Sequence, residues 1–508
     1  MEINKQESII PILSKVYETA VEQGVDTEFT LPDYYPEISK ILKIISVVNI
    51  SSSKCDNGDI SVGGQTVLTV LYFGNDENLN SYTYNVPFVK SIDASPQVSG
   101  AVTVETKINY INSKVVSPRK IEIHGAISLN ISVNNISENS FLSHCECEGV
   151  FTKNAGSMLI LPMSPITKSV FVDDEVSVSE GKKSIGKILR SSANALIDES
   201  KYVSGKVVIK GAVLLELLCL PSDNGRPFII KESRGFSQII DCDAAGEIIT
   251  FDVFPHIENI ELRPKTSLDG EVRTVAFEAK VGIDVLGYYA QEVDYISDAF
   301  SCKYSTNILR EKFEFIDHVS NLNDKYLCEK EFDFTGVLKE VLDLHCNALV
   351  DYCASDGNDV VIKGNIPVSI IGIDTQGEYG YFEKILDFEY RCGFKQTLEK
   401  IKCRPVVNVV ATDYHLNNDG VLKLSVELKV EANVFCATDI RAVSAVEVDC
   451  DNIINKADNS AVTLYFAENE SSWEIAQKYG VSPKSICEVN NLGDIDMKYK
   501  GVLLIPCM

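Results

Sequence analysis

The stretch VVIKGAVLLELLCL, residues 207–220, decides the fold because its pattern occurs three times in the chain. The other copies are VGGQTVLTVLYF at residues 62–73 and VVIKGNIPVSIIGI at residues 360–373. Each copy has a glycine followed by a run of apolar residues, many of them β-branched or aromatic, and then a stretch rich in turn-forming residues. Such runs are typical of strands that end in loops. The sequence therefore predicts the same strand and loop three times.

The similarity extends upstream over 27 ungapped positions, residues 38–64, 185–211 and 338–364, which lie 147 and 153 residues apart. Each copy also ends in a segment with alternating apolar and polar residues, which predicts a strand with one buried face. These segments are residues 120–133, 273–286 and 422–435. A repeat of this length is a domain, so we expect a mainly β protein with three tandem domains, each a β-sandwich or an open barrel.

Two details complete this expectation. We expect a turn or two of helix near Ile38, Ile185 and Leu338. The connectors near residues 135–180 and 290–335 contain MLILPM (158–163) and KFEFIDHV (312–319), which are apolar enough to pack as extra strands.

The composition is that of a folded protein with several cores. A chain of 508 residues exceeds one ordinary core, and 45% of its residues are hydrophobic. The formal net charge of −26 repels phosphate, so we expect no nucleic-acid partner. No apolar segment is long enough to span a membrane, and the N-terminus does not have the pattern of an export signal, so we expect neither an integral membrane protein nor an exported one. The fifteen cysteines are odd in number and scattered through apolar runs, which is typical of reduced cytosolic thiols.

The stretch NESSWEIAQKYGVSPKSICEVNNL, residues 469–492, contains the only tryptophan of the chain. Its apolar residues have helical spacing, Gly480 is suited to end a helix, and Ser482 with Pro483 is suited to begin the next one. We therefore predict two short helices between two strands. The predicted core of this module is Trp473, Ile475, Ala476, Tyr479, Ile486 and Val489.

Two resemblances to known families follow from these segments. The repeated stretches at 62–73 and 207–220, with Pro87 and Phe88 further on, resemble the SPOCS (DUF3794) domain of endospore-forming Firmicutes. Residues 462–506 resemble a LysM domain, a β-α-α-β module. WEIAQKYGVSPKSICEVNNL (473–492) follows the pattern W-x-I-A-x-x-Y-x-V-x-x-x-x-[LI]-x-x-x-N-x-L, and LLIP (503–506) resembles the closing strand.

Three SPOCS-like domains and a terminal LysM domain together resemble the spore-envelope morphogenesis proteins of clostridial endospore formers. The resemblance implies SPOCS-like domains at residues 1–150, 151–300 and 301–455, and a LysM domain at 460–508. It implies a non-enzymatic adaptor in the mother-cell cytoplasm, located at the forespore surface and in the spore coat. The implied partners are a coat morphogenetic ATPase, bound through the LysM domain, and other coat proteins. A second hypothesis is a protein that binds the N-acetylglucosamine glycan of peptidoglycan or cortex.

In LysM domains the glycan lies on two loops, which correspond here to residues 470–472 and 490–492. The chain departs from the family there, with NESSW (469–473) in place of GD[ST]LW and with Tyr499, Lys500 and Gly501 in place of PGQ. This departure favours a protein partner over a sugar. The candidate partner-binding or glycan-binding residues are Glu470, Ser471, Ser472, Lys478, Asn490, Asn491, Leu492 and Tyr499.

No catalytic or cofactor motif occurs in the sequence. GxSxG and the P-loop GxxxxGK[ST] are both absent, and the six histidines share no motif. The run HCEC (144–147) is the only candidate metal site, and its spacing lacks a partner motif that would complete a tetrahedral site. We therefore expect no catalytic residue, no metal and no cofactor, and we interpret the acidic run at 173–175 as solvated surface.

Overall fold

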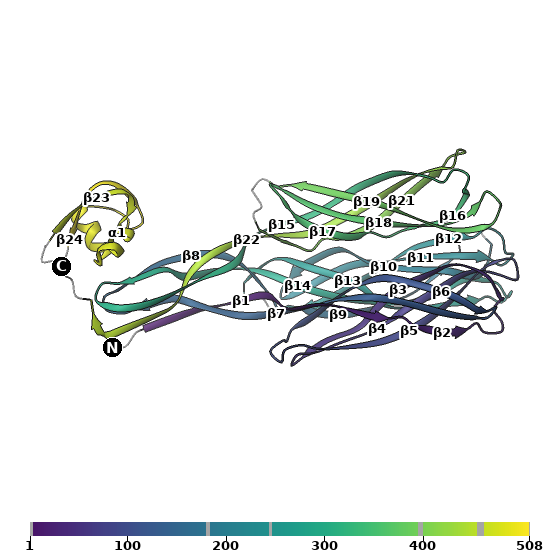
Figure 1. The fold of residues 1–508 in the computed structure, drawn as a ribbon, viewed down its shortest axis with the longest axis horizontal. Helices are drawn as coiled ribbons and strands as arrows, with labels where there is room; N and C mark the ends of the chain where they lie inside the picture. The colour runs from purple at the N-terminus through teal and green to yellow at the C-terminus, as the bar shows by residue number, and fades with distance from the viewer. Residues whose placement is uncertain (1–3, 179–182, 243–245, 395–399, 455–461, 507–508) are drawn as a thin grey trace.

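The computed structural model describes residues 4–178, 183–242, 246–394, 400–454 and 462–506. The fold is mainly β, as predicted, and its two helices both lie near the C-terminal end of the described chain. No helix in these ranges is both long and apolar enough to cross a membrane. Figure 1 shows a broad body, a narrower extension that we call the stalk, and a small module beyond the stalk.

The strands form three successive groups, which we call the first, second and third units. The first unit contains β1 (Asn4–Gly24), β2 (Thr27–Thr30), β3 (Ile38–Asp56), β4 (Asp59–Gly74), β5 (Leu79–Asp93), β6 (Ala101–Ser117) and β7 (Lys120–Glu146). The second unit contains β8 (Val150–Pro162), β9 (Ile166–Ser177), β10 (Ile185–Val203), β11 (Lys206–Pro221), β12 (Phe228–Asp241), β13 (Glu247–Thr266) and β14 (Val272–Ser301). The third unit contains β15 (Tyr304–Asp333), β16 (Leu338–Cys346), β17 (Leu349–Asp356), β18 (Asp359–Asp374), β19 (Tyr379–Gly393), β20 (Ile401–Cys403), β21 (Val406–Leu416) and β22 (Val421–Ile453).

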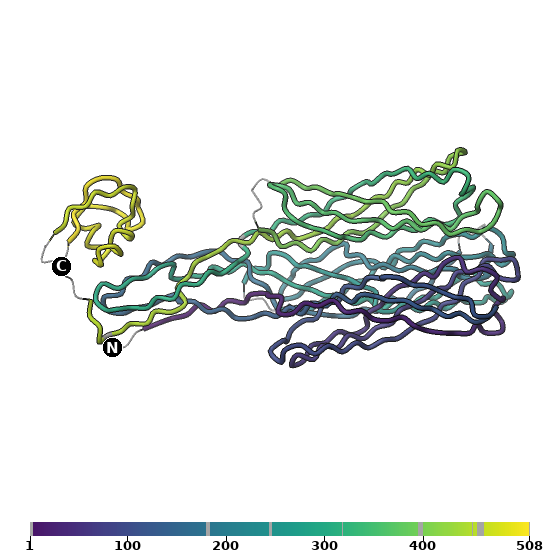
Figure 2. Tube along the Cα trace, in the orientation of Figure 1, coloured from purple at the N-terminus to yellow at the C-terminus, as the bar shows by residue number. Residues whose placement is uncertain are grey.

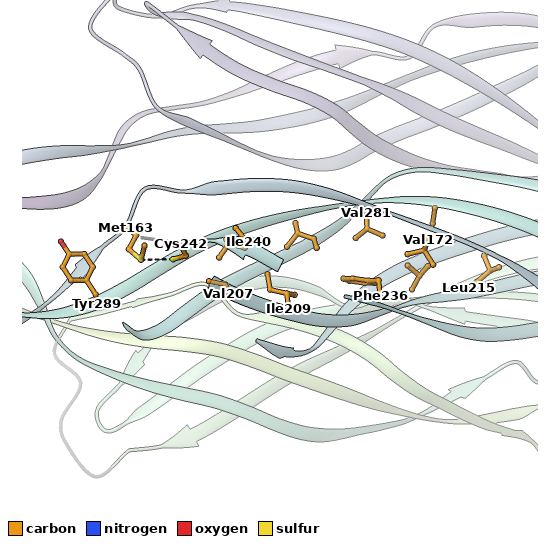
Figure 3. Close-up of a cluster of buried hydrophobic side chains, with 14 of the residues drawn as sticks. Met163, Val172, Val207, Ile209, Leu215, Phe236, Ile240, Cys242, Val281 and Tyr289 are labelled. Atoms are coloured by element: carbon orange, nitrogen blue, oxygen red, sulfur yellow. Dashed lines mark hydrogen bonds between the residues drawn. The ribbon is translucent and has the colours of Figure 1, made fainter. Parts of the chain in front are cut away.

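Each unit packs a small antiparallel sheet against a second sheet that contains at least one very long strand. The small sheets have the orders β3-β4-β5, β10-β11-β12 and β16-β18-β17 with β19 beside β18. The long strands are β7, β14 and β22, and they include the predicted alternating segments. Each unit has a hydrophobic core, and that of the second unit continues into the neighbouring units through Phe141 of β7 and Phe313 of β15. Figure 3 shows the core of the second unit, where Phe236 of the small sheet lies near Val172 of β9 and Val281 of β14.

The helical turns predicted near Ile38, Ile185 and Leu338 are wrong, because strands begin at all three residues. The ladder between the first strand and the middle strand of each small sheet begins with two β-bulges, at Ile38/Lys40 and Ile41/Lys43 in the first unit. The other two units have bulges at the corresponding positions. A bulge adds a residue to one strand and interrupts the alternation of its faces. The apolar residues therefore recur at a spacing close to three, which in the sequence indicates a helix.

The three small sheets contact one another in a closed ring. β5 contacts β10, β12 contacts β16, and β19 contacts β3, so the third unit closes on the first. An apolar cluster lies where the sheets meet, and it includes Leu71, Leu218 and Ile371, one from each unit. These three residues occupy the same position in the alignment of the repeated segments. We call the three contacts between neighbouring units seams.

The stalk consists of three strand pairs that continue from the body. The later parts of the long strands pair with the N-terminal strand β1 and with two strands from the connectors: β7 with β1, β14 with β8, and β22 with β15. A single bridge between Ile316 and Ile160 also joins β15 to β8, so the second and third units share one sheet. The connectors thus contain strands, as the MLILPM and KFEFIDHV segments predicted. Figure 2 shows the chain running along the stalk and returning to the body in each unit.

A common apolar cluster holds the three stalk pairs together. It contains two residues from each long strand, three positions apart: Leu142 and Cys145, Ile296 and Ala299, and Val443 and Val446. All six are at most 5% exposed. The stalk is therefore a packed element with its own core.

Candidate functional site

The C-terminal module has the predicted β-α-α-β order. It consists of β23 (Val462–Ser471), α1 (Ser472–Tyr479), α2 (Pro483–Asn490) and β24 (Lys498–Pro506), with β23 and β24 antiparallel. A capping box begins α1, in which the Ser471 side chain accepts from the backbone N–H of Glu474 and the Glu474 side chain accepts from the backbone N–H of Ser471. These hydrogen bonds lower the pKa of Glu474. Gly480 ends the helix at a φ of 61°, in the left-handed region.

Most of the predicted module core is buried. Trp473, Ile475, Ala476 and Ile486 are at most 3% exposed, and Tyr479 packs against this cluster while remaining partly exposed. Val489 is 44% exposed, so its assignment to the buried stripe of α2 is wrong. The side chain of Asn490 points inward instead. Its amide donates to the carbonyl oxygen of Leu504 at 2.7 Å and accepts from the N–H of Leu504 at 2.8 Å, which joins α2 to β24 and turns Val489 outward.

The loop before α1 is held by bonds within the module. Ser471 is 6% exposed and Ser472 is 1% exposed, so neither hydroxyl is presented to solvent. Glu470 accepts a hydrogen bond of 2.6 Å from the hydroxyl of Tyr465. The Tyr465 hydroxyl in turn accepts from Lys478 at 3.0 Å. The structure thus joins Glu470 and Lys478 through Tyr465, and it uses Ser471 as a helix cap.

The second predicted loop is also largely committed to the module itself. Asn491 is exposed and ends α2 in a left-handed conformation, with a φ of 56°. Leu492 and Tyr499 pack against the module core. Of the eight predicted binding residues, only Lys478 and Asn491 are exposed, and the others are buried or half-buried.

Trp473 joins the module to the tip of the stalk, a contact that the sequence did not predict. Its indole N–H donates a hydrogen bond of 2.9 Å to the Oδ2 atom of Asp298 in β14. Its ring meets that of Phe300 edge to face, with centroids 4.9 Å apart at 72°. Lys153 of β8 forms an ion pair of 2.6 Å with Asp496, in the segment between α2 and β24. The tryptophan is therefore both a core residue of the module and its main contact with the stalk.

This contact lies where the two predicted binding loops approach each other. The backbone N–H of Trp473 donates to the carbonyl oxygen of Ile495, which joins the start of α1 to the segment after α2. Asp298 and Lys153 are opposite each other on paired strands of the stalk, and they contact these two parts of the module. The stalk thus lies against the side of the module on which the two predicted binding loops meet.

The sheet of the module presents an apolar surface on its other side. Leu464 and Leu504 lie opposite each other on β23 and β24, and so do Phe466 and Val502. With Val462 they form what we call the apolar stripe, in which every side chain is at least 40% exposed. Residues between them, such as Ala467, Leu503 and Ile505, point into the core. The β23 sequence VTLYFA is apolar at nearly every position, and this pattern could have indicated that both faces of the strand are apolar.

The HCEC run and the acidic run at 173–175 contain residues that contact other parts of the fold. Cys145 of the HCEC run is 5% exposed in the stalk cluster, and its burial raises the pKa of the thiol. Asp174 of the acidic run forms an ion pair with Arg234 at 2.6 Å. Within the described ranges, no group of three or more His, Cys, Asp or Glu residues is arranged to hold a metal ion.

A buried ion cluster lies at the seam between the second and third units. Arg190 of β10 and Asp343 of β16 are 5% and 2% exposed, and their side chains approach to 2.9 Å. Arg190 also contacts Glu216 at 2.7 Å. Arg190 makes these contacts through Nη2 alone, and its buried Nε and Nη1 atoms have no hydrogen-bond partner among the described residues. Separating the two units would leave buried charges unpaired, so the cluster favours the observed contact between them.

The predicted domain boundaries at 150 and 300 lie beside the short segments that separate β7 from β8 and β14 from β15. The boundary between 455 and 460 lies outside the described residues. Comparison of the chain with protein-family models, with curated proteins and with solved structures found no match. Membership of the SPOCS and LysM families therefore remains a prediction from the sequence.

Proposed function

We propose that this protein is a non-enzymatic adaptor in assembly of the endospore envelope, and that its C-terminal module binds a coat morphogenetic ATPase. The observation that carries the proposal is the apolar stripe on the module's sheet. Monomeric proteins rarely expose contiguous apolar surface without a binding role. The module stands beyond the stalk, at a distance from the body, where a large partner has access to it (Figure 1).

The body supports the same proposal. The three units share a strand order and have bulges at corresponding places, which supports three tandem repeats of one SPOCS-like domain. In this proposal the ring of small sheets is a rigid base, and other coat proteins bind on its outer surface. The cytoplasm of the mother cell, at the forespore surface, is the proposed location.

The loop residues favour a protein partner over a glycan. A sugar site needs hydroxyl and amide groups directed to solvent, whereas in this module Ser471 caps α1, Asn490 bonds to β24 and Ser472 is buried. The side on which the two loops meet also lies against the stalk. Binding to peptidoglycan or cortex glycan is therefore the less favoured function.

The test is a pull-down from sporulating cells of an endospore former, with bound proteins identified by mass. The variant Phe466→Ser with Val502→Ser removes the centre of the apolar stripe and changes only exposed positions. We expect it to lose the ATPase that the wild-type chain retains. Ile385→Ser, at a 57% exposed position on β19, is the matched control and should retain it.

Two further results bear on the proposal. Fluorescence of Trp473, the only tryptophan, reports whether the module of each variant is folded. Capture of the ATPase by the folded double variant at the wild-type level would refute binding through the stripe. Sedimentation of wild-type protein with insoluble peptidoglycan, lost on deletion of residues 460–508, would favour the glycan hypothesis instead.

A further inference from the structure

The three seams of the ring are formed by equivalent elements of the three units, so each seam can be compared with the other two. In each seam the turn after the middle strand of one small sheet faces the bulged first strand of the next. Lys40, Lys187 and Glu340 occupy the same alignment position, directly after the first bulge. A bulge changes the direction of the side chain that follows it. In the two seams where Lys187 and Glu340 have partners, this side chain points toward the neighbouring turn.

Two seams fill this position with ionic partners from within the chain. In the seam between the first and second units, Lys187 lies 3.5 Å from the carboxylate of Asp76 and also donates to the Asn80 side chain. Asn80 is completely buried there. In the seam between the second and third units, Glu340 pairs with Arg226. Both seams are thereby closed by opposite charges.

The third seam lacks these side chains at the equivalent position, although Lys43 of β3 pairs with Glu383 of β19 beside it at 2.7 Å. Gln376 takes the place of Asp76, and Gly380 takes the place of Asn80, so both the carboxylate and the buried amide are missing. Within the described ranges no ion pair involves Lys40. A cavity of about 380 Å³ lies at this seam, lined by Lys40 and Gln376 together with apolar side chains that include Leu42, Val337 and Phe382.

The lining restricts what the cavity accepts. The Thr375 hydroxyl already donates to the carbonyl oxygen of Gly336, and Asp374 accepts the backbone N–H groups of Gln376 and Glu378. The Lys40 ammonium and the Gln376 amide are left to meet a ligand. The wall also contains the apolar side chains of Leu42, Val337 and Phe382 beside polar ones, which suits a ligand that has a hydrophobic part as well as a charged one.

We propose that the third seam binds a carboxylate carried on an apolar body, which takes the place that Asp76 has opposite Lys187. The carboxylate comes from the acidic side chain of a protein segment or from a small organic acid. This inference uses the alignment of the three units and is independent of the apolar stripe and its partner.

Calorimetric titration of the full-length chain tests the proposal with three probes. Hexanoate stands for a small organic acid, hexanamide is its uncharged control, and the capped peptide acetyl-Gly-Asp-Leu-Gly-amide stands for a protein segment. We expect saturable binding of hexanoate, of the peptide or of both, and at least tenfold weaker binding of hexanamide. Binding of only one carboxylate probe identifies the source and supports the proposal.

Two variants locate the site. Lys40→Gln removes the ammonium, and Gln376→Asp supplies an internal carboxylate as Asp76 does; each should weaken binding of the carboxylate probes at least tenfold. Lys54→Gln, at an exposed lysine of the same strand, should bind as wild type. Absence of saturable binding by both carboxylate probes would overturn the proposal, and so would equal binding by wild type, Lys40→Gln and Gln376→Asp.

Discussion

Replacing Asp298 by Asn tests how the module is held at the tip of the stalk. Asp298 uses both carboxylate oxygens: Oδ1 accepts from Arg310 at 2.6 Å, and Oδ2 accepts from the indole N–H of Trp473 at 2.9 Å. Asparagine keeps one oxygen, which remains with the arginine. Its amide N–H₂ then faces the indole N–H, and two donors cannot form a hydrogen bond.

The expected loss follows from the type of bond. A hydrogen bond to a charged acceptor contributes about 1.5–3 kcal/mol, which corresponds to a roughly 10- to 150-fold lower ratio of attached to detached module. The edge-to-face contact with Phe300 remains and contributes about 0.5–1.5 kcal/mol. The exposed ion pair of Lys153 with Asp496 adds at most about 1 kcal/mol. We therefore expect the free energy lost with the indole hydrogen bond to be large relative to the free energy of the contacts that still hold the module to the stalk.

The assay uses the single tryptophan, which is 3% exposed in the attached state. In the Asp298→Asn variant we expect emission to shift to longer wavelength and quenching by acrylamide to increase, because water reaches the indole. Asp294→Asn makes the same change of charge at an exposed position of β14 and should behave as wild type. Equal quenching of the two variants would refute the role assigned to the indole hydrogen bond.

Three further predictions concern stability. Asp343→Asn removes one of the two carboxylates that contact the buried Arg190, the other being Glu216, and should lower the free energy of unfolding by about 1.5–3 kcal/mol in urea denaturation. Arg190→Met combined with Asp343→Leu should recover most of this, and a loss below about 1 kcal/mol would contradict the assigned burial. Burial raises the pKa of Asp252 to about 6 despite hydrogen bonds from neighbouring side chains, so the folded chain holds this proton more tightly than the unfolded one. The stabilisation from this proton is complete below about pH 4 and is lost as the pH rises through 6. Between these values the free energy of unfolding should fall by about 1.4 kcal/mol per pH unit. Asp252→Asn should remove this slope from stability measured across pH 4–7, and an unchanged slope would refute the shift. Ser471→Ala removes the cap of α1 and should cost about 0.5–2 kcal/mol in thermal unfolding of residues 460–508, with Ser485→Ala, inside α2, as a control that should change it little.

The repeated pattern predicted the strand content of the body, because alternation along residues 120–133, 273–286 and 422–435 directly reflects one buried face of a sheet. It could not predict the starts of the small sheets, where bulges replace alternation by a spacing near three. The ring was also beyond prediction. Arg190 and Asp343 occupy one alignment position in two different units and carry opposite charges. The reason for this difference is their ion pair across the seam, which is visible only once the two units are known to lie side by side.

The module shows the same division between local and distant contacts. Helix caps, the turn at Gly480 and the burial of Ile475 and Ile486 follow from neighbouring residues, so the sequence predicted them. The outward direction of Val489 depends on the bonds of Asn490 to β24, which lies further along the chain. The contact of Trp473 with Asp298 joins residues 175 positions apart, and no spacing pattern reports such a contact.

The long strands have a mechanical consequence. β14 runs without interruption from its pairing with β13 in the body to its pairing with β8 at the tip of the stalk. Tension between the module and the body therefore acts along the strands, and the ladder bonds that lie across this direction must fail together in shear. The thirteen residues of β8 extend about 40 Å at roughly 3.3 Å per residue, so the stalk also sets a minimum distance between whatever the module holds and whatever the body holds.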